Sequence, residues 1–308
     1  MSGAAKAVPI VRGPQRRSMQ MWDGDVSYLA WEEASAKAPA LHFAHANGFN
    51  ALTYRWLLDR LASGFRVYAN DLRGHGLTTL AANPKGMQSW LTYRDDLLRW
   101  MEALDGRPKL LCGHSMGATA SLMAAIAKPQ TVTGVVLVEP VIMPPRYLRW
   151  LKIMRTLGLL DYVFPMVARA QRRRSIWPNR QAMFEAYRGR GAFASWPEQV
   201  VRDYIEGGTV DFLDGKQVRL ACTPGWEAAN YRAGAPNVWA QIGELRCPVT
   251  LIVGAKRSTC PDFVIDMLAK ARPGMRIVRV PEASHFLPME YPEIVLAEIR
   301  AMAALSHG

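Results

Sequence analysis

The segment Gly113-His114-Ser115-Met116-Gly117 constrains the fold of this chain more than any other. It follows a short apolar run that ends at Cys112 and precedes small and apolar helix formers at 118–127. A serine flanked by glycines at this spacing fits a sharp strand-to-helix turn, because a side chain at either glycine would clash in so tight a bend. Such a turn, a nucleophile elbow, holds the serine hydroxyl out at the end of a sheet. The pattern alone also fits a Gly-rich turn before a buried helix, so evidence from the rest of the chain is needed to distinguish the two.

Strands and helices alternate on both sides of a long segment in which the alternation stops. Strands are expected at 18–22, 26–31, 39–45, 65–70, 109–112 and 134–140, and after the interruption at 248–254 and 275–280. Helices are expected near 51–62, 88–104, 118–127, 262–271 and 292–304. The interruption holds Arg-rich and Trp-rich helical segments broken by Pro and Gly.

This order predicts an α/β fold: a mostly parallel, doubly wound sheet that carries an inserted helical lid. The predicted organisation is an N-terminal arm at 1–16, a core at 17–140 and 247–308, and the lid at 141–246.

Composition narrows the cellular setting and the partners. The four cysteines form no C-x-x-C pair, and we expect free thiols in a reducing compartment. The first residues lack the apolar core of a signal peptide and no apolar run has the length of a membrane span, so the protein is predicted to be cytoplasmic. The formal charge of +12 comes without a nucleic-acid-binding motif, and nucleic acid is not an expected partner.

Two further loops follow predicted strands, at the edge where sheets of this kind place their sites. His285 comes after the final strand and is the candidate general base for Ser115. After the third strand, a small Gly-containing loop brings Asn47 to the same edge. The backbone amides of Asn47 and Met116 are the candidate oxyanion hole, although a plain strand-ending turn also explains the loop.

Four motifs in one order give the chain a resemblance to a known superfamily. They are His45-Ala-Asn-Gly-Phe49, Asp71-Leu-Arg-Gly-His-Gly76, Gly113-His-Ser-Met-Gly117 and Ser284-His285-Phe286. Together they resemble the α/β-hydrolase superfamily, in its lid-bearing branch of small esterases, carbon–carbon bond hydrolases, epoxide hydrolases and haloalkane dehalogenases. The resemblance covers about 18–140 and 247–304, and Ala46 departs from the more usual His-Gly.

The resemblance implies an eight-stranded sheet and Ser–His–acid catalysis with no metal and no cofactor. Epoxide hydrolases and dehalogenases use an Asp nucleophile. Ser115 therefore favours attack on an ester, a thioester or an activated ketone.

The acid of the predicted triad is out of its usual place. The loop after the seventh strand normally supplies it, but here Arg257 stands where a carboxylate is expected. Asp262, the next acid, follows Pro261 in the way a helix N-terminus is built. Glu139 ends the very apolar strand after the nucleophile, where a carboxylate needs a partner. We favour Glu139 over Asp262, while pairing of Glu139 with a lid arginine remains an alternative.

The lid has sixteen Lys and Arg against nine Asp and Glu. This excess indicates either attraction of an anionic substrate or merely a solvated helix face. The predicted function is that of a serine hydrolase, a carboxylesterase acting on a small or medium acyl ester. The alternatives are a carbon–carbon bond hydrolase with the same triad and a non-catalytic ligand-binding member of the fold. Docking of the lid on an anionic membrane has the least support, because no strongly amphipathic segment stands out in the sequence.

Overall fold

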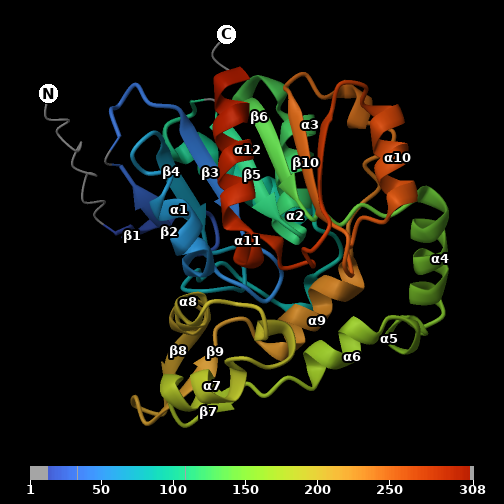
Figure 1. Ribbon diagram of the computed structural model, residues 1–308. Coiled ribbons are helices and arrows are strands. Elements are labelled where there is room, and N and C mark those ends of the chain that lie inside the picture. Colours follow the sequence, from blue (N-terminus) through green and yellow to red (C-terminus); the bar gives the residue numbers. More distant parts are fainter. Residues whose placement is uncertain (1–12, 33, 108, 306–308) are drawn as a thin grey trace, which may run out of the picture.

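The computed structural model describes residues 13–32, 34–107 and 109–305, and eight of its strands form one sheet (Figure 1). Their order is β1-β2-β4-β3-β5-β6-β10-β11. The strands are β1 (Gln15–Gln20), β2 (Asp25–Trp31), β3 (Ala40–Ala44), β4 (Arg66–Asn70), β5 (Lys109–His114), β6 (Val132–Val138), β10 (Val249–Gly254) and β11 (Arg276–Val280). Strand β2 runs antiparallel to both of its neighbours, and the remaining pairs are parallel.

The central strands are buried on both faces, which explains why they read as continuous apolar runs and not as alternating ones. Every residue of β3, β5 and β10 is buried. One face packs against α2 (Leu91–Leu104), α3 (Met116–Ala127) and α10 (Asp262–Ala271). The other face packs against α1 (Arg55–Asp59) and α12 (Pro292–Leu305), the helix in front of the sheet in Figure 1.

Two local expectations differ from the structure near the N-terminus. Strand β1 begins at Gln15, inside the segment expected as an arm, because its pairing with β2 extends to Gln15↔Ala30. Residues 1–12 of that arm lie outside the described residues. The single helix expected near 51–62 is a 3₁₀ turn, Ala51–Tyr54, followed by the short helix α1.

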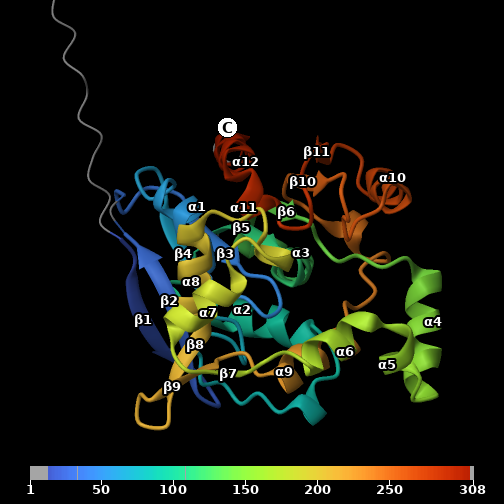
Figure 2. The same cartoon turned by 60° about the horizontal axis from the view of Figure 1, so that its bottom comes forward.

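The segment between β6 and β10 crosses the end of the sheet at which the parallel strands finish (Figures 1 and 2). Its helices are α4 (Pro145–Thr156), α5 (Leu160–Val163), α6 (Pro165–Gln171), α7 (Arg180–Tyr187), α8 (Glu198–Gly208) and α9 (Pro224–Ala233). We call residues 141–246 the lid.

The sequence predicts a helical lid, but the lid of the structure also contains strands. It contains a three-stranded antiparallel sheet of β7 (Ile176–Trp177), β9 (Gln217–Leu220) and β8 (Thr209–Phe212). Strands β8 and β9 form a hairpin whose turn places Asp214 and Gly215 at positive φ, 54° and 79°. An Asp-Gly pair between two short strands is typical of a hairpin. The hairpin was not predicted because the Arg-rich composition of the lid suggested helices.

Candidate active site

Ser115 lies on a strained turn between β5 and α3. Its backbone angles are φ 56° and ψ −119°, a region that non-glycine residues rarely occupy. A Cβ on Gly113 would lie 2.5 Å from the backbone of Gly117, and one on Gly117 would overlap the carbonyl oxygen of Ala44. Both glycines are therefore required, one to close the turn and the other to let α3 pack against the end of β3.

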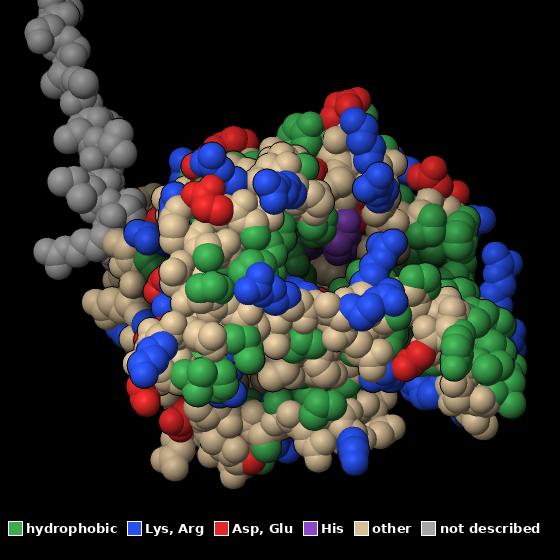
Figure 3. Space-filling model, turned by 90° about the horizontal axis from the view of Figure 1, so that it is seen from below, with side chains coloured by type: hydrophobic (Ala, Val, Ile, Leu, Met, Phe, Trp, Pro, Cys, Tyr) green, Lys and Arg blue, Asp and Glu red, His purple; other side chains and the backbone are tan. Residues whose placement is uncertain are grey.

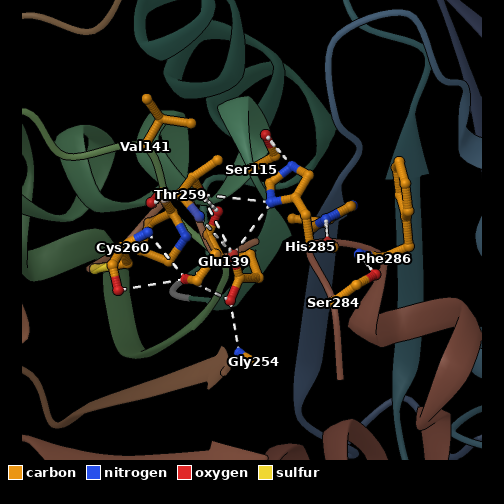
Figure 4. Close-up of polar contacts among 12 residues, drawn as sticks. Ser115, Glu139, Val141, Gly254, Thr259, Cys260, Ser284, His285 and Phe286 are labelled. Carbon is orange, nitrogen blue, oxygen red and sulfur yellow. Dashed lines mark hydrogen bonds and ion pairs between the residues drawn. The ribbon is translucent and has the colours of Figure 1, made fainter. Parts of the chain in front are cut away.

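The structure brings together Ser115, His285 and Glu139, which come from the ends of three strands (Figure 4). The Nε2 atom of His285 lies 3.1 Å from the Ser115 Oγ atom, within hydrogen-bonding distance. On the other side of the ring, the His285 Nδ1 atom lies 3.2 Å from the Glu139 Oε2 atom. With Nδ1 protonated, the Nε2 lone pair faces the serine hydroxyl, which is the arrangement a general base requires.

Glu139 is fully buried, and its carboxylate is held by donors from the loop after β10. It accepts hydrogen bonds from the Gly254 amide at 2.6 Å, the Ser258 hydroxyl at 2.9 Å and the Thr259 amide at 3.0 Å. These donors replace the water that the buried charge has lost. Within the described chain the only basic side chain that pairs with it is His285, and no lid arginine does, so the alternative of a lid arginine is wrong.

The competing acid, Asp262, lies elsewhere. It is the first residue of α10, its side chain is 81% exposed, and it forms an ion pair with Arg279. This is the helix-terminus role that the preceding proline predicts. Arg257 is also exposed, at a positive φ of 54°.

The loop that carries Asn47 lies beside the elbow, and both Asn47 and Met116 line the cavity above Ser115. The side chain of Asn47 is held by the lid helix α9: its amide donates to the Glu227 carbonyl at 3.1 Å, and its oxygen accepts from Asn230 at 2.8 Å. Met116 is the first residue of α3, whose opening N–H groups have no partner within the helix. The two residues whose amides are predicted to form an oxyanion hole thus line one cavity.

Two buried histidines, His45 and His75, hold the Asn47 loop through backbone amides. His75 Nε2 accepts from the Gly48 amide at 3.0 Å, and His45 Nε2 accepts from the Leu72 amide at 2.9 Å. Each ring donates its Nδ1 proton to a nearby backbone carbonyl, so both are neutral. Burial lowers the pKa of His45 to about 4 and that of His75 to about 3.

A third buried histidine, His114, links this loop to His285. The Ala46 amide donates to the Tyr54 hydroxyl at 3.2 Å, and that hydroxyl donates to His114 Nδ1 at 2.7 Å. The His114 Nε2 proton is then directed to the carbonyl oxygen of His285, 2.7 Å away. Burial, followed by the proximity of His285, lowers the pKa of His114 well below its usual value, which keeps the ring neutral.

Sequence reasoning missed four residues that hold the candidate triad and the Asn47 loop: Ser258, Thr259, Asn230 and His114. The signal for Ser258 and Thr259 was present, since hydroxyl residues fill a loop from which the usual acid is absent. Nothing in the sequence marks Asn230, because its partner is 183 residues away.

The cavity above Ser115 has a volume of about 630 Å³ and is walled mainly by apolar side chains of the lid and the core. Its charged lining residues are Lys152, Arg155, Arg173, Arg232 and Glu227. Arg173 pairs with Glu227 at 2.6 Å. Figure 3 shows the hollow, with a histidine side chain (purple) inside it and Lys and Arg side chains (blue) around its rim. Within the described residues, no helix has both the length and the apolar character needed to cross a lipid bilayer.

The sequence and the fold both match known proteins. A sequence model of the alpha/beta hydrolase family matches residues 43–298. The chain is 26% identical over 261 residues to the 2-(acetamidomethylene)succinate hydrolase of Mesorhizobium japonicum, covering 85% of this chain and 86% of that protein.

Two solved structures show the same architecture. The crystal structure of E-2-(acetamidomethylene)succinate hydrolase has a TM-score of 0.75 at 22% identity, covering 94% of this chain and 99% of that one. The thioesterase domain from the curacin biosynthetic pathway has a TM-score of 0.75 at 20% identity, covering 94% of this chain and all of that domain, 100%. At such identities the likeness bears on the fold alone, and it confirms the predicted eight-stranded, mostly parallel sheet.

Proposed function

The chain belongs to the alpha/beta hydrolase family, and from that premise we propose that it is a serine hydrolase whose nucleophile is Ser115. The observation that carries the proposal is the chain of two contacts, 3.1 Å from Ser115 Oγ to His285 Nε2 and 3.2 Å from His285 Nδ1 to Glu139 Oε2. A nucleophile, a base and an orienting carboxylate in this geometry form the triad of acyl transfer.

In the proposed mechanism, the Ser115 oxygen attacks the substrate carbonyl while its proton passes to His285 Nε2. The negative charge that develops on the carbonyl oxygen is stabilised by the amides of Met116 and Asn47. His285 returns the proton to the leaving group, and the acyl group stays on Ser115. Water, deprotonated by the same histidine, then releases the acid. Glu139 keeps the imidazole in the required tautomer and stabilises its charged form.

The proposed substrate is a small or medium acyl ester, because the cavity is mainly apolar and large enough for an acyl chain. Of the four cations in its lining, Arg173 pairs with Glu227 and Arg232 pairs with Asp161. The other two, Lys152 and Arg155, favour a substrate with a negative group away from the scissile bond. The relative from Mesorhizobium japonicum is named for a succinate derivative, a compound of that kind. A carbon–carbon bond hydrolase would use the same three residues.

Labelling with a fluorophosphonate probe tests the nucleophile. We expect the wild-type protein to label once and stoichiometrically, and the Ser115→Ala variant not to label. A wild-type protein that does not label while its circular dichroism and melting curve are those of a folded protein would contradict the proposal, and would favour a ligand-binding role.

A matched substrate panel tests the substrate class. It compares p-nitrophenyl hexanoate, the mono-p-nitrophenyl ester of adipic acid and a β-diketone at low and high salt. We expect ester turnover, with the carboxylate-bearing ester preferred at low salt and the preference reduced at high salt. Turnover of the diketone alone would replace the esterase by the carbon–carbon bond hydrolase.

A further inference from the structure

The lid exposes apolar side chains to an extent that the rest of the described chain does not. More than half of the large exposed hydrophobic side chains of the described chain lie between residues 150 and 166 of the lid. We call this set the apolar lid face: Trp150, Ile153, Leu157, Leu159, Tyr162, Val163 and Met166. The helices α4 and α5 that carry most of it project from one side of the molecule (Figure 2). The hydrophobic surface at the right-hand edge of Figure 3 lies over them.

Helix α4 lacks a partner on its outer side. It has twelve residues, none of which is buried, although half of them are large apolar side chains. Isolated helices of this length are marginally stable in water, and an amphipathic helix is normally held by packing of its apolar face. Ile153 and Leu157 are 54% and 60% exposed. A contiguous exposed patch of this kind marks an interaction surface.

The charge of the same segment indicates which kind of partner binds the apolar lid face. Four cations, Arg146, Arg149, Lys152 and Arg155, repeat at every third residue of α4, and no acid occurs between residues 145 and 160. Lys152 and Arg155 line the cavity above Ser115, whereas Arg146 and Arg149 do not, and within the described chain neither of these two pairs with a carboxylate. Apolar side chains interleaved with unneutralised cations complement a surface that is apolar inside and negatively charged outside.

We propose that the apolar lid face, with Arg146 and Arg149 of α4, forms a docking surface for anionic lipid bilayers. The helix would lie in the plane of the interface, with Trp150, Ile153 and Leu157 among the acyl chains and Arg146 and Arg149 at the phosphates. The inner side of α4 lines the cavity above Ser115 through Leu148 and Leu151. The proposal does not depend on the triad, since binding requires no turnover.

A vesicle sedimentation assay with the full chain tests it. The probes are vesicles of phosphatidylcholine alone and of phosphatidylcholine with about a third phosphatidylglycerol. We expect binding only to the anionic vesicles, and weaker binding as salt is raised. The Arg146→Gln/Arg149→Gln variant should bind about 30-fold more weakly, taking about 1 kcal/mol per charge at the surface. Ile153→Ser should weaken binding about tenfold.

Matched variants on the lid hairpin serve as controls. Lys216→Gln/Arg219→Gln removes the same charge, and Leu213→Ser removes an apolar side chain that is 56% exposed. Both should bind as the wild type does. If the two charge variants lose affinity equally, the net charge of the molecule explains binding and the proposal is wrong.

Insertion is measured with a dye. The four native cysteines are free and buried, so an environment-sensitive maleimide will label Ile153→Cys selectively. Its emission should shift to the blue on anionic vesicles, whereas a label at Leu213→Cys should not shift. The absence of a shift would overturn the proposal. So would a concentration-dependent dimer in sedimentation velocity that Ile153→Ser abolishes without vesicles, because a second copy of the chain would then cover the face.

Discussion

Glu139 reaches a histidine from a neighbouring part of the sheet because of the order of three strands. Strand β6 pairs with β10, and β10 pairs with β11, after which His285 follows. The loop after β10 therefore lies between the end of β6 and the His285 loop, and its amide and hydroxyl groups hold the carboxylate. The loop after β10 therefore donates hydrogen bonds to the carboxylate of Glu139 and does not supply the proposed acid itself. The strand-end rule predicted Ser115, His285 and Glu139 from the sequence, and the structure brings the three side chains together. Ser258 and Thr259 could not be predicted, because their role depends on where the carboxylate of Glu139 lies.

Replacing the two candidate acids separates them at the level of single residues. Glu139→Gln keeps the side-chain shape but removes the charge that orients His285, and we expect kcat to fall by about 10³–10⁴-fold. Asp262→Asn removes only an exposed ion pair with Arg279, and kcat should stay within about twofold. Steady-state kinetics on one p-nitrophenyl ester provide the measurement, with melting curves as the check on folding. Loss of activity in Asp262→Asn with Glu139→Gln active would reverse the assignment of the acid.

At the scale of elements, local patterns located the core strands and helices to within a few residues, because each strand carries its own apolar run and each helix its own period. They failed where an element depends on distant partners. The hairpin of β8 and β9 and the short strand β7 form a sheet only because β7 reaches β9 from more than thirty residues upstream. Likewise, the apolar side chains Trp150 and Ile153 of α4 are plain in the sequence, but their exposure becomes evident only when the fold leaves that side of the helix uncovered.

Helix α9 holds the Asn47 loop, and a pair of variants tests that contact. Asn230→Ala removes the 2.8 Å bond to Asn47, and we expect kcat to fall about 10- to 100-fold while Ser115 still labels with a fluorophosphonate. Tyr93→Phe is the control, since it removes only the 2.8 Å bond from the tyrosine hydroxyl to the far side of Asn230. Its kcat should stay close to that of the wild type. Equal losses in both variants would mean that general weakening of the lid, and not the Asn47 contact, explains the effect.

At the scale of the whole molecule, the fold encloses several histidines that must stay neutral. Burial, together with the charge of Lys109, lowers the pKa of His42 to about 3, and His75 and His45 have pKa values of about 3 and 4. In the unfolded chain each titrates near pH 6.5. Between these values the unfolded state binds more protons than the folded state, so stability is fully present above pH 6.5 and falls as the pH is lowered.

This titration sets how the molecule responds to acid. At pH 5, each of the three histidines should remove about 2 kcal/mol from the free energy of unfolding at pH 7. His42 isolates one share, because neither of its ring nitrogens has a hydrogen-bond partner among the described residues, and its ring packs 5.2 Å from Trp100. His42→Leu should therefore keep the stability at pH 7 and lose about 2 kcal/mol less at pH 5. Urea unfolding at pH 7, 6 and 5 measures both chains, above the range in which most carboxylates titrate. Equal losses in the wild type and in His42→Leu would show that His42 is not neutral in the folded protein, since only a ring that stays unprotonated on folding couples its burial to pH.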